Sequence, residues 1–450
     1  MISLLDKYIR GKKTLILGFG REGKSTFRFI KKHFPTIDIN IADKNCNLDT
    51  SDTGDINPEN LFLGEKYLDA IQYFDVIIKS PGINIKAVHE KYKHKLWLSQ
   101  TGLFLEQYHR QVIGITGTKG KSTTSSLIHH ILKSAGAKSI LVGNIGQPPF
   151  DLIDEIDSDT HIVFELSANQ LEFVNHAPHV AVLLNLFPEH LDYFGTSEKY
   201  FDAKLNIVKF QGVGDVLIYD SGNKNIAELL KSITVKSGKL SFHENDGGNI
   251  SGSNSDLFKE IILSNHKLKG KHNLKNISAA ALACLEAGVA KEEIIKGVKS
   301  FSPLEHRLEF VGNFCGIDFY NDSISTIPES TIEAVKTIKN IHTLILGGFD
   351  RGIDYSSMLK FLSESNVVRL IFTGPAGKRM MTELEGMENK NQQIFFIEDF
   401  NDLSYLLPKT EKGKACVLSP AASSYDQFKD FEERGRAFKK MAESLIASCP

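Results

Sequence analysis

The sequence predicts an α/β fold of three domains, because three glycine-rich turns each follow a short apolar run and precede a stretch of helical spacing. The turns are Gly18–Gly23, Gly114–Lys121 and Gly347–Gly352. A buried strand, a glycine turn and a helix form the opening unit of a doubly wound sheet. A chain of 450 residues also exceeds what one hydrophobic core usually organises. We therefore expect domains at residues 1–101, 102–303 and 304–450.

The apolar runs that predict buried parallel strands recur along the whole chain. The expected strands are Thr14–Gly18, Val76–Lys79, Val112–Ile115, His161–Glu165, Val180–Leu184, Thr343–Leu346 and Arg369–Phe372. Helices are expected after Gly23, Lys121, Asn273, Pro328 and Phe431. The polar segment Asn245–Asp256, rich in Gly, Ser and Asn, predicts a surface loop.

Composition limits the kinds of ligand and partner. The formal net charge of -2 argues against a broad surface for nucleic acid but allows a local site for small anions. The five cysteines are scattered, which argues against a disulfide framework or a zinc knuckle. The sequence contains neither a signal peptide nor an apolar span long enough to cross a bilayer. We expect a cytoplasmic monomer that binds small molecules and neither nucleic acid nor membrane.

The middle glycine turn has the sequence of a phosphate-binding loop. It follows the apolar run Val112–Ile115 and precedes a helical stretch, Ser125–Ala135. Backbone N–H groups of such a loop surround phosphate oxygens, while its Lys reaches the outer phosphates and its Ser ligates Mg²⁺. A strict Walker pattern needs glycine at Ile115, and an ordinary strand-helix turn is the alternative interpretation. The residues predicted to hold ATP here are Gly117, Thr118, Lys119, Gly120, Lys121, Ser122 and Thr123.

The first glycine turn, Gly18–Gly23, matches a dinucleotide fingerprint, with Asp43 at the expected distance. Three interpretations remain open: an NAD site, glycines that only permit tight packing, or a site for another nucleotide diphosphate. Ser80 and Gly82 follow the strand Val76–Lys79 and could face the same ligand.

Polar residues follow two buried runs of the middle domain. Glu165 ends one run, and His190 lies just beyond the next. A lone Glu or His of this kind is often a solvated loop residue. Beside a phosphate-binding loop, however, the two could complete a Mg²⁺ site, because Mg²⁺ bound to phosphates needs few protein ligands. Asn273 and Asn276 share a helix face, and Arg307 suits a polyphosphate.

Taken together, these motifs resemble those of the Mur ligases, from about Gly11 to the last helix. The shared elements are Gly117–Thr123, Glu165-Leu-Ser, His190-Leu-Asp, His272–Asn276, Glu305-His-Arg307 and Asn321-Asp-Ser323. The segment Leu418–Gly435 resembles that of the members that add D-glutamate. The resemblance implies a Rossmann-like N-terminal domain, a central P-loop ATPase domain and a Rossmann-like C-terminal domain.

The resemblance also implies a role for each matching residue. It places a uridine nucleotide at Gly20, Arg21, Asp43, Lys44, Ser80 and Gly82, and its muramoyl-alanyl end at Asn144 and His190. It places ATP at Lys121, Asn273, Asn276, Arg307 and Asp322, with Mg²⁺ on Ser122 and Glu165. It implies that Lys204 is carbamylated and holds a second Mg²⁺ with His190. Glutamate would meet Thr326, Arg351, Ser424 and Phe431; some relatives carry Lys at Ile324 and at Arg351.

The implied activity is the ATP-dependent joining of D-glutamate to UDP-MurNAc-L-Ala through an acyl phosphate, with Lys121, His190, Lys204 and Arg307 as the catalytic residues. Alternatives within the class are a Mur-type or folylpolyglutamate-type ligase for another amino acid. An NAD-dependent oxidoreductase would use Gly18–Gly23 but leaves the P-loop unexplained. A non-enzymatic nucleotide-binding regulator would need only the P-loop.

Overall fold

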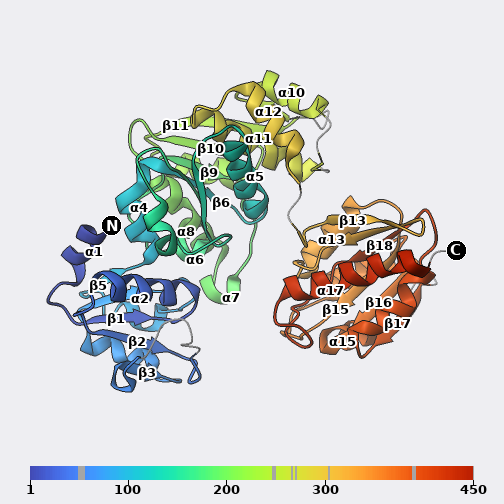
Figure 1. The fold of residues 1–450 in the computed structure, drawn as a ribbon, viewed down its shortest axis with the longest axis horizontal. Coiled ribbons are helices and arrows are strands. Elements are labelled where there is room, and N and C mark those ends of the chain that lie inside the picture. The colour runs from blue at the N-terminus through green and yellow to red at the C-terminus, as the bar shows by residue number, and fades with distance from the viewer. Residues whose placement is uncertain are drawn as a thin grey trace. The chain divides into compact units, whose positions relative to one another are not determined.

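The computed structural model describes residues 1–48, 56–245, 250–264, 267–268, 271–302, 305–387 and 392–448. Its described part contains three parallel-rich sheets, which establishes the expected α/β class (Figure 1). The chain divides into two compact units, Met1–Phe301 and Ser302–Pro450. The first unit contains two sheets and the second unit contains one. Pro303, near which the second domain join is expected, lies outside the described residues.

The first sheet has the strand order β3-β2-β1-β4-β5, and its strands are paired in parallel. The chain leaves the central strand in one direction and returns on the other side at β4, so the carboxyl ends of β1 and β4 flank the crevice where such sheets bind ligands. The strands are β1 (Thr14–Leu17), β2 (Ile39–Asp43), β3 (Leu61–Leu63), β4 (Val76–Lys79) and β5 (Leu96–Leu98). The helices are α1 (Ile2–Ile9), α2 (Arg21–His33), α3 (Lys86–His89) and α4 (Gln100–Tyr108).

The second sheet has the order β12-β11-β10-β9-β6-β8-β7, and β12 pairs antiparallel with β11. The interior strand β6 lies between β8 and β9, so the loops that follow these three strands meet at one edge. The strands are β6 (Val112–Thr116), β7 (Ser139–Gly143), β8 (His161–Glu165), β9 (Val180–Leu183), β10 (Val216–Asp220), β11 (Gly238–Glu244) and β12 (Ile250–Gly252). The helices are α5 (Lys121–Ser134), α6 (Ala168–Leu171), α7 (Leu191–Phe194), α8 (Ser197–Lys209), α9 (Lys224–Ser232), α10 (Ser255–Leu263), α11 (Lys271–Glu286) and α12 (Lys291–Ser300).

Alternating side chains of the second sheet enter two different cores, as the period of a strand requires. Ile113 and Val182 pack with α5, α11 and α12. Phe164 faces the other way, in a core that also contains Leu103 of α4 and Ile16 of β1. The first two sheets therefore share one core, which explains why they form one compact unit.

The third sheet, in the second unit, has the order β13-β14-β18-β15-β16-β17, with β13 antiparallel to β14. Apolar side chains of α14 and α15 cover one face, and those of α17 cover the other. The strands are β13 (Glu309–Phe314), β14 (Ile317–Asn321), β15 (Ile341–Gly347), β16 (Arg369–Thr373), β17 (Gln393–Ile397) and β18 (Ala415–Leu418). The helices are α13 (Pro328–Thr337), α14 (Ser356–Ser363), α15 (Gly374–Glu385), α16 (Leu403–Leu406) and α17 (Phe431–Ser444).

The expected strands are present, with ends that differ by up to two residues. The expected surface loop Asn245–Asp256 is wrong in part, because Ile250–Gly252 form β12 and α10 begins at Ser255. Ile250 is buried and pairs with Glu244 at the sheet edge, a contact that so short a run does not reveal in sequence. Residues 246–249 of that segment lie outside the described part.

Cys315 is disulfide-bonded, whereas Cys46, Cys284 and Cys416 are free thiols. Within the described ranges, no helix has the length and apolar character that crossing a membrane requires.

Candidate active site

The phosphate-binding loop follows β6, and its glycines have the backbone geometry that the motif predicts. Gly120 has a φ of 87°, in the left-handed region, and immediately precedes α5. A Cβ atom at Gly120 would lie 2.3 Å from Oδ1 of Asn276. The amide of Asn276 donates to Oδ1 of Asn273 at 3.1 Å. The structure thus brings both predicted asparagines of α11 to the loop.

Two side chains hold the loop in place. Nζ of Lys121 donates to the main-chain oxygens of Gly117 (3.0 Å) and Thr118 (3.1 Å). Asn185, just after β9, accepts from the Lys119 amide at 2.8 Å and donates to the Lys119 oxygen at 2.9 Å. Asn185 was not among the residues predicted from the sequence. Its place directly after a buried strand, two residues beyond β9, was the available signal.

Glu165 lies at the carboxyl end of β8, beside β6, and is fully buried. Its Oε1 accepts from the amide of Asn144 at 2.9 Å. Its Oε2 is shielded from solvent and has no hydrogen-bond partner. A buried carboxylate oxygen without a partner is costly unless a cation or a proton occupies it. Glu165 therefore fits the expected role of a Mg²⁺ ligand.

Lys204 of α8 points at the same loop and is 1% exposed. Its Nζ donates to the Gly117 oxygen at 2.9 Å and lies 3.4 Å from the Thr116 hydroxyl. The ring of Tyr200 lies 4.9 Å from this nitrogen. Burial, followed by the nearby charge of Lys121, lowers the pKa of Lys204 well below its ordinary value. The neutral amine is therefore accessible.

His190 lies at the more open side of this cluster, with 59% of its side chain exposed. Its ring centre is 5.8 Å from that of Tyr200, and its Nε2 is 3.8 Å from Glu189. Glu189 also forms an ion pair of 2.6 Å with Lys119. Hence the loops after β6, β8 and β9 and the helix α8 converge at one edge of the sheet, as their order in the sequence predicts. In the described ranges, no group of three or more His, Cys, Asp or Glu residues is placed to hold a metal.

The first glycine turn is braced by two of its predicted ligand-binding residues. Asp43 accepts from the main-chain amides of Phe19 (2.6 Å) and Asn45 (2.8 Å), so both of its oxygens bond to the backbone. The Ser80 hydroxyl donates to the Gly18 oxygen at 2.7 Å. A Cβ atom at Gly20 or Gly82 would meet no atom within 4 Å, so these two glycines border open space. Lys44 is exposed and pairs with Glu65 at 3.3 Å.

Side chains of the same turn reach the second sheet. Arg21 donates to the oxygen of Gly146, which follows β7, at 2.6 Å. Glu22, which the sequence analysis did not single out, accepts from the amide of Gln170 in α6 at 2.7 Å. Burial raises the pKa of Glu22 to about 7, although Gln170 and the charges of Arg21 and Lys79 oppose the shift. The turn therefore contacts the loops around Asn144 and Glu165 directly.

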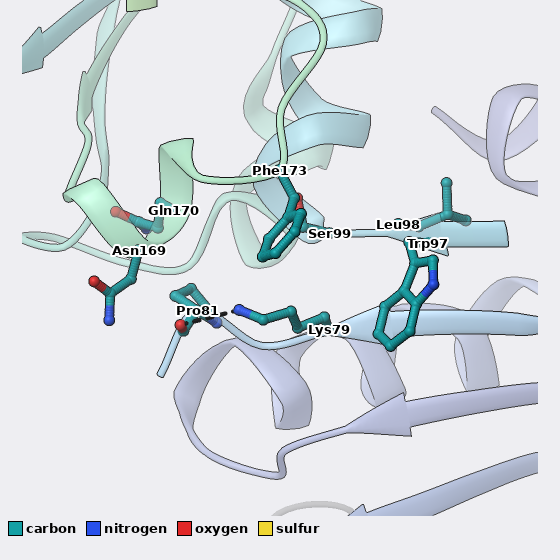
Figure 2. A pocket seen from close by; sticks show the side chains of 8 residues that line it. All are labelled: Lys79, Pro81, Trp97, Leu98, Ser99, Asn169, Gln170 and Phe173. Atoms are coloured by element: carbon teal, nitrogen blue, oxygen red, sulfur yellow. Dashed lines mark hydrogen bonds between the residues drawn. The ribbon is translucent and has the colours of Figure 1, made fainter. Parts of the chain in front are cut away.

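A small cavity adjoins this contact, between β4, β5 and α6. Figure 2 shows Lys79 extended toward Pro81, to whose oxygen it donates at 3.2 Å, with Phe173 and Trp97 beside it. The cavity encloses about 10 Å³, which is room for about one water molecule. Burial lowers the pKa of Lys79 to about 8. The cavity is too small for a nucleotide.

The second unit holds the predicted pair Arg307 and Asp322. Asp322 is 2% exposed and accepts from the hydroxyls of Ser325 (2.5 Å) and Ser419 (2.7 Å). Burial raises its pKa to about 6, while those bonds and the charge of Arg307 lower it. Nε of Arg307 is buried without a hydrogen-bond partner. Such a donor is available to a ligand.

The residues predicted for glutamate follow the carboxyl ends of β14, β15 and β18. Nη1 of Arg351 donates to the Ser423 hydroxyl at 3.1 Å, and the buried Ser424 is the next residue. The main-chain oxygen of Phe431, the first residue of α17, accepts from the Ser323 hydroxyl at 2.7 Å. Thr326 lies half-buried in the loop between β14 and α13. Arg434, which lies beneath these loops, was not among the residues predicted from the sequence.

The site combines a P-loop after β6, the buried carboxylate of Glu165 and the buried Lys204 of α8. These features define a nucleotide-hydrolysing or phosphoryl-transferring α/β protein. Comparison with known proteins narrows this class. Residues 115–284 match the model of the Mur ligase middle domain. The UDP-N-acetylmuramoylalanine–D-glutamate ligase of Clostridium kluyveri is 33% identical over 456 residues, which cover 98% of each chain. The enzyme of that name from Koribacter versatilis is 32% identical over 97% of this chain and 98% of its own.

Solved structures agree on the fold. The MurF ligase of Thermotoga maritima in complex with ADP superposes with a TM-score of 0.58 at 17% identity, over 98% of this chain and 97% of its own. UDP-N-acetylmuramate-alanine ligase MurC of the same organism gives a TM-score of 0.57 at 16% identity, over 96% and 99%. The chain belongs to the Mur ligase family. It is an ATP-dependent, amide-bond-forming ligase of peptidoglycan precursor synthesis.

Proposed function

We propose that the enzyme joins the amine of D-glutamate to the alanyl carboxylate of UDP-MurNAc-L-Ala, with cleavage of ATP to ADP and phosphate. The observation that carries this substrate assignment is the name shared by full-length relatives at 32–33% identity. The Arg351–Ser423 bond supports it, because a cation beside a hydroxyl suits a carboxylate. A Mur-type ligase for another amino acid is the alternative.

The chemistry needs an activated acid, since a carboxylate does not condense with an amine at neutral pH. A carboxylate oxygen attacks the γ-phosphorus, and the bond from that phosphorus to ADP breaks. The amine nitrogen then adds to the acyl carbon of the resulting acyl phosphate, loses its proton, and inorganic phosphate leaves. The P-loop amides and Lys121 align the phosphates and stabilise the charge that develops on their oxygens.

The proposal also assigns residues to ATP and to the uridine nucleotide. We assign the phosphates of ATP to Gly117–Thr123, and the remainder of ATP to Asn273, Asn276, Arg307 and Asp322. The uridine nucleotide is assigned to the crevice at Gly20, Arg21, Lys44, Ser80 and Gly82, with Asp43 bracing the loop. We likewise propose domains at 1–101, 102–303 and 304–450.

Two Mg²⁺ ions are part of the proposal, and the residues present fit them. Ser122 and the unpartnered Oε2 of Glu165 would hold one ion, and His190 with a carbamylated Lys204 would hold the other. Bound Mg²⁺ supplies charge neutralisation on phosphate oxygens. The buried Nζ of Lys204 favours the neutral amine that reacts with CO₂.

The deciding experiment measures phosphate release from ATP with UDP-MurNAc-L-Ala and each candidate amino acid in turn. We expect release that requires both the nucleotide and D-glutamate. Equal turnover with L-glutamate or lysine would contradict the substrate assignment. Release that is independent of any amino acid would favour a nucleotide hydrolase.

A further inference from the structure

Arg434, in the first turn of α17, carries a fully buried cation. Its side chain is among the largest buried ones, with 2% exposure. Nε donates to the Ser323 hydroxyl at 3.0 Å, and Nη2 donates to the oxygens of Ser323 (2.8 Å) and Ala422 (3.0 Å). Nη1 donates to the oxygens of Ser423 (3.1 Å) and Gly347 (3.4 Å). Every one of these acceptors is neutral, which is unusual for a buried guanidinium.

The acceptors belong to the ends of three neighbouring strands. Gly347 ends β15, Ser323 follows β14, and Ala422 and Ser423 follow β18. The strand β18 lies between β14 and β15, and both pairings are parallel. The fork of one side chain therefore ties together three loops at the carboxyl edge of the sheet, where α/β proteins bind ligands.

The same loops carry the groups assigned to the amino acid. Ser423, whose carbonyl accepts from Arg434, also receives the bond from Arg351 through its hydroxyl. The Ser323 hydroxyl, which accepts from Arg434, donates to the oxygen of Phe431. A Cβ atom at Gly348 would lie 3.0 Å from Nη1 of Arg434, so the glycine turn lies directly against the guanidinium. Any shift of Arg434 would move all of these groups together.

The charge of Arg434 is poorly compensated. Among the described residues, no carboxylate hydrogen-bonds to its guanidinium or pairs with it within 4.0 Å. The carboxyl that attracts it most is Asp426, and a Cβ at Gly374 would lie 2.2 Å from Oδ2 of Asp426, so this carboxyl faces that glycine. Burial lowers the pKa of Arg434 to about 10, so it remains protonated at neutral pH. A charge in a region of low dielectric acts over a longer distance than one in water.

We infer that Arg434 is a positioning residue of the amino-acid subsite, and that its buried charge helps to select an acidic amino acid. The fork of its hydrogen bonds sets the positions of Ser423, Ser424 and Phe431. Its charge lowers the free energy of a dicarboxylate bound above these loops relative to a neutral amino acid. The inference rests on the proposed function, since it concerns the same subsite.

The test compares Arg434→Lys, which keeps the charge and loses the fork, with Arg434→Met, which loses both. Initial rates are measured while D-glutamate, ATP and UDP-MurNAc-L-Ala are varied separately. We expect the KM for D-glutamate to rise about tenfold in Arg434→Lys and about a hundredfold in Arg434→Met, on the scale of about 1.4 kcal/mol for each factor of ten. The KM values for ATP and for the nucleotide should stay within about twofold.

Two further variants keep the inference falsifiable. Ser323→Ala removes one acceptor of the fork together with the bond that the Ser323 hydroxyl donates to the Phe431 oxygen, and we expect a rise of about threefold in the KM for D-glutamate alone. Arg436→Met is the matched control, because Arg436 is exposed on the same helix and pairs with Glu432; its kinetics should match the wild type. Circular dichroism identifies any variant that fails to fold, and the result then rests on Ser323→Ala and Arg434→Lys.

The outcomes separate this inference from the proposed function. Wild-type turnover with an uncharged amino acid in place of D-glutamate would overturn the proposed function and with it the subsite. Normal wild-type turnover with D-glutamate, together with an unchanged D-glutamate KM in folded Arg434 variants, would overturn only the role of Arg434. A parallel rise of all three KM values would also overturn it, because it would indicate a general structural role.

Discussion

Nζ of Lys204 donates to the main-chain oxygen of Gly117 at 2.9 Å, so a lysine of α8 meets the first glycine of the P-loop. A positive charge here would repel Mg²⁺, whereas a carbamate on the same nitrogen would attract it. If Mg²⁺ binds as proposed, we expect the chemical state of Lys204 to decide activity.

We predict that Lys204→Ala loses activity by about 10²–10³-fold, the range typical for one preorganised electrostatic group. Acetate or formate should restore part of the activity by supplying the missing carboxylate, whereas Lys204→Arg should remain inactive. Phosphate release with and without added acetate measures both effects. Substantial activity in Lys204→Arg would show that a cation suffices, and the carbamate proposal would fail.

Lys121→Ala should abolish phosphate release while leaving UDP-MurNAc-L-Ala bound, because Lys121 braces the P-loop and the proposed uridine site belongs to the first sheet. Isothermal calorimetry of the nucleotide, beside the ATPase rate, tests this. Lys133→Ala is the control, since Lys133 lies exposed in the last turn of the same helix. Loss of nucleotide binding together with activity would contradict the proposed division of the two sites.

Gly120→Ala should disrupt ATP use more than it disrupts folding. The added Cβ would lie 2.3 Å from Oδ1 of Asn276, in a residue with a φ of 87°. Gly136→Ala is a matched control at the other end of α5, because Gly136 has a φ of 80° and no atom within 4 Å of an added Cβ. We expect both variants to lose about 1–2 kcal/mol from backbone strain. Only Gly120→Ala should also lose ATP affinity, measured by equilibrium binding; equal affinities would argue against Asn276 as a neighbour of the nucleotide.

Glu22 should make the stability of the first unit depend on pH. Its folded pKa, about 7, lies above the ordinary 4.5, so the stabilisation is complete below about pH 4.5 and is lost as the pH rises through 7. The full loss corresponds to about 3 kcal/mol. Glu22→Gln removes this pH dependence. Between about pH 5 and pH 7.5, the Tm of the wild type should therefore fall by about 5 °C relative to that of the variant.

The measurement is kept below about pH 8. The pKa of Lys79, whose charge attracts Glu22, is lowered to about 8, so that charge is lost at higher pH. Differential scanning calorimetry at several pH values provides the comparison. Glu59→Gln, at an exposed position of the same unit, is the control and should follow the wild-type curve. A constant difference between Glu22→Gln and the wild type over this range would contradict the raised pKa.

The sequence by itself determined the fold class and placed the P-loop motif between a buried strand and a helix. Short apolar runs, glycine turns and helical spacing are local patterns, and each of them constrains the backbone within a few residues. The P-loop, Glu165 and His190 could be placed at one sheet edge for the same reason, since each follows a buried parallel strand. The edge strand Ile250–Gly252 was missed because three residues carry too little periodicity to distinguish a strand from a loop.

Only the tertiary structure decided which distant side chains complete the sites. Asn185 contacts the P-loop and Glu22 contacts Gln170, and the paired residues lie 66 and 148 positions apart in the sequence. Arg434 contacts residues at the ends of three different strands. In the sequence, Arg434 looks like one more charged residue at the start of an amphipathic helix. Its burial depends on the packing of α17 across neighbouring parallel strands, because the hydrogen bonds that it donates to carbonyl oxygens at their ends are what make a buried guanidinium tolerable. No local pattern contains that information.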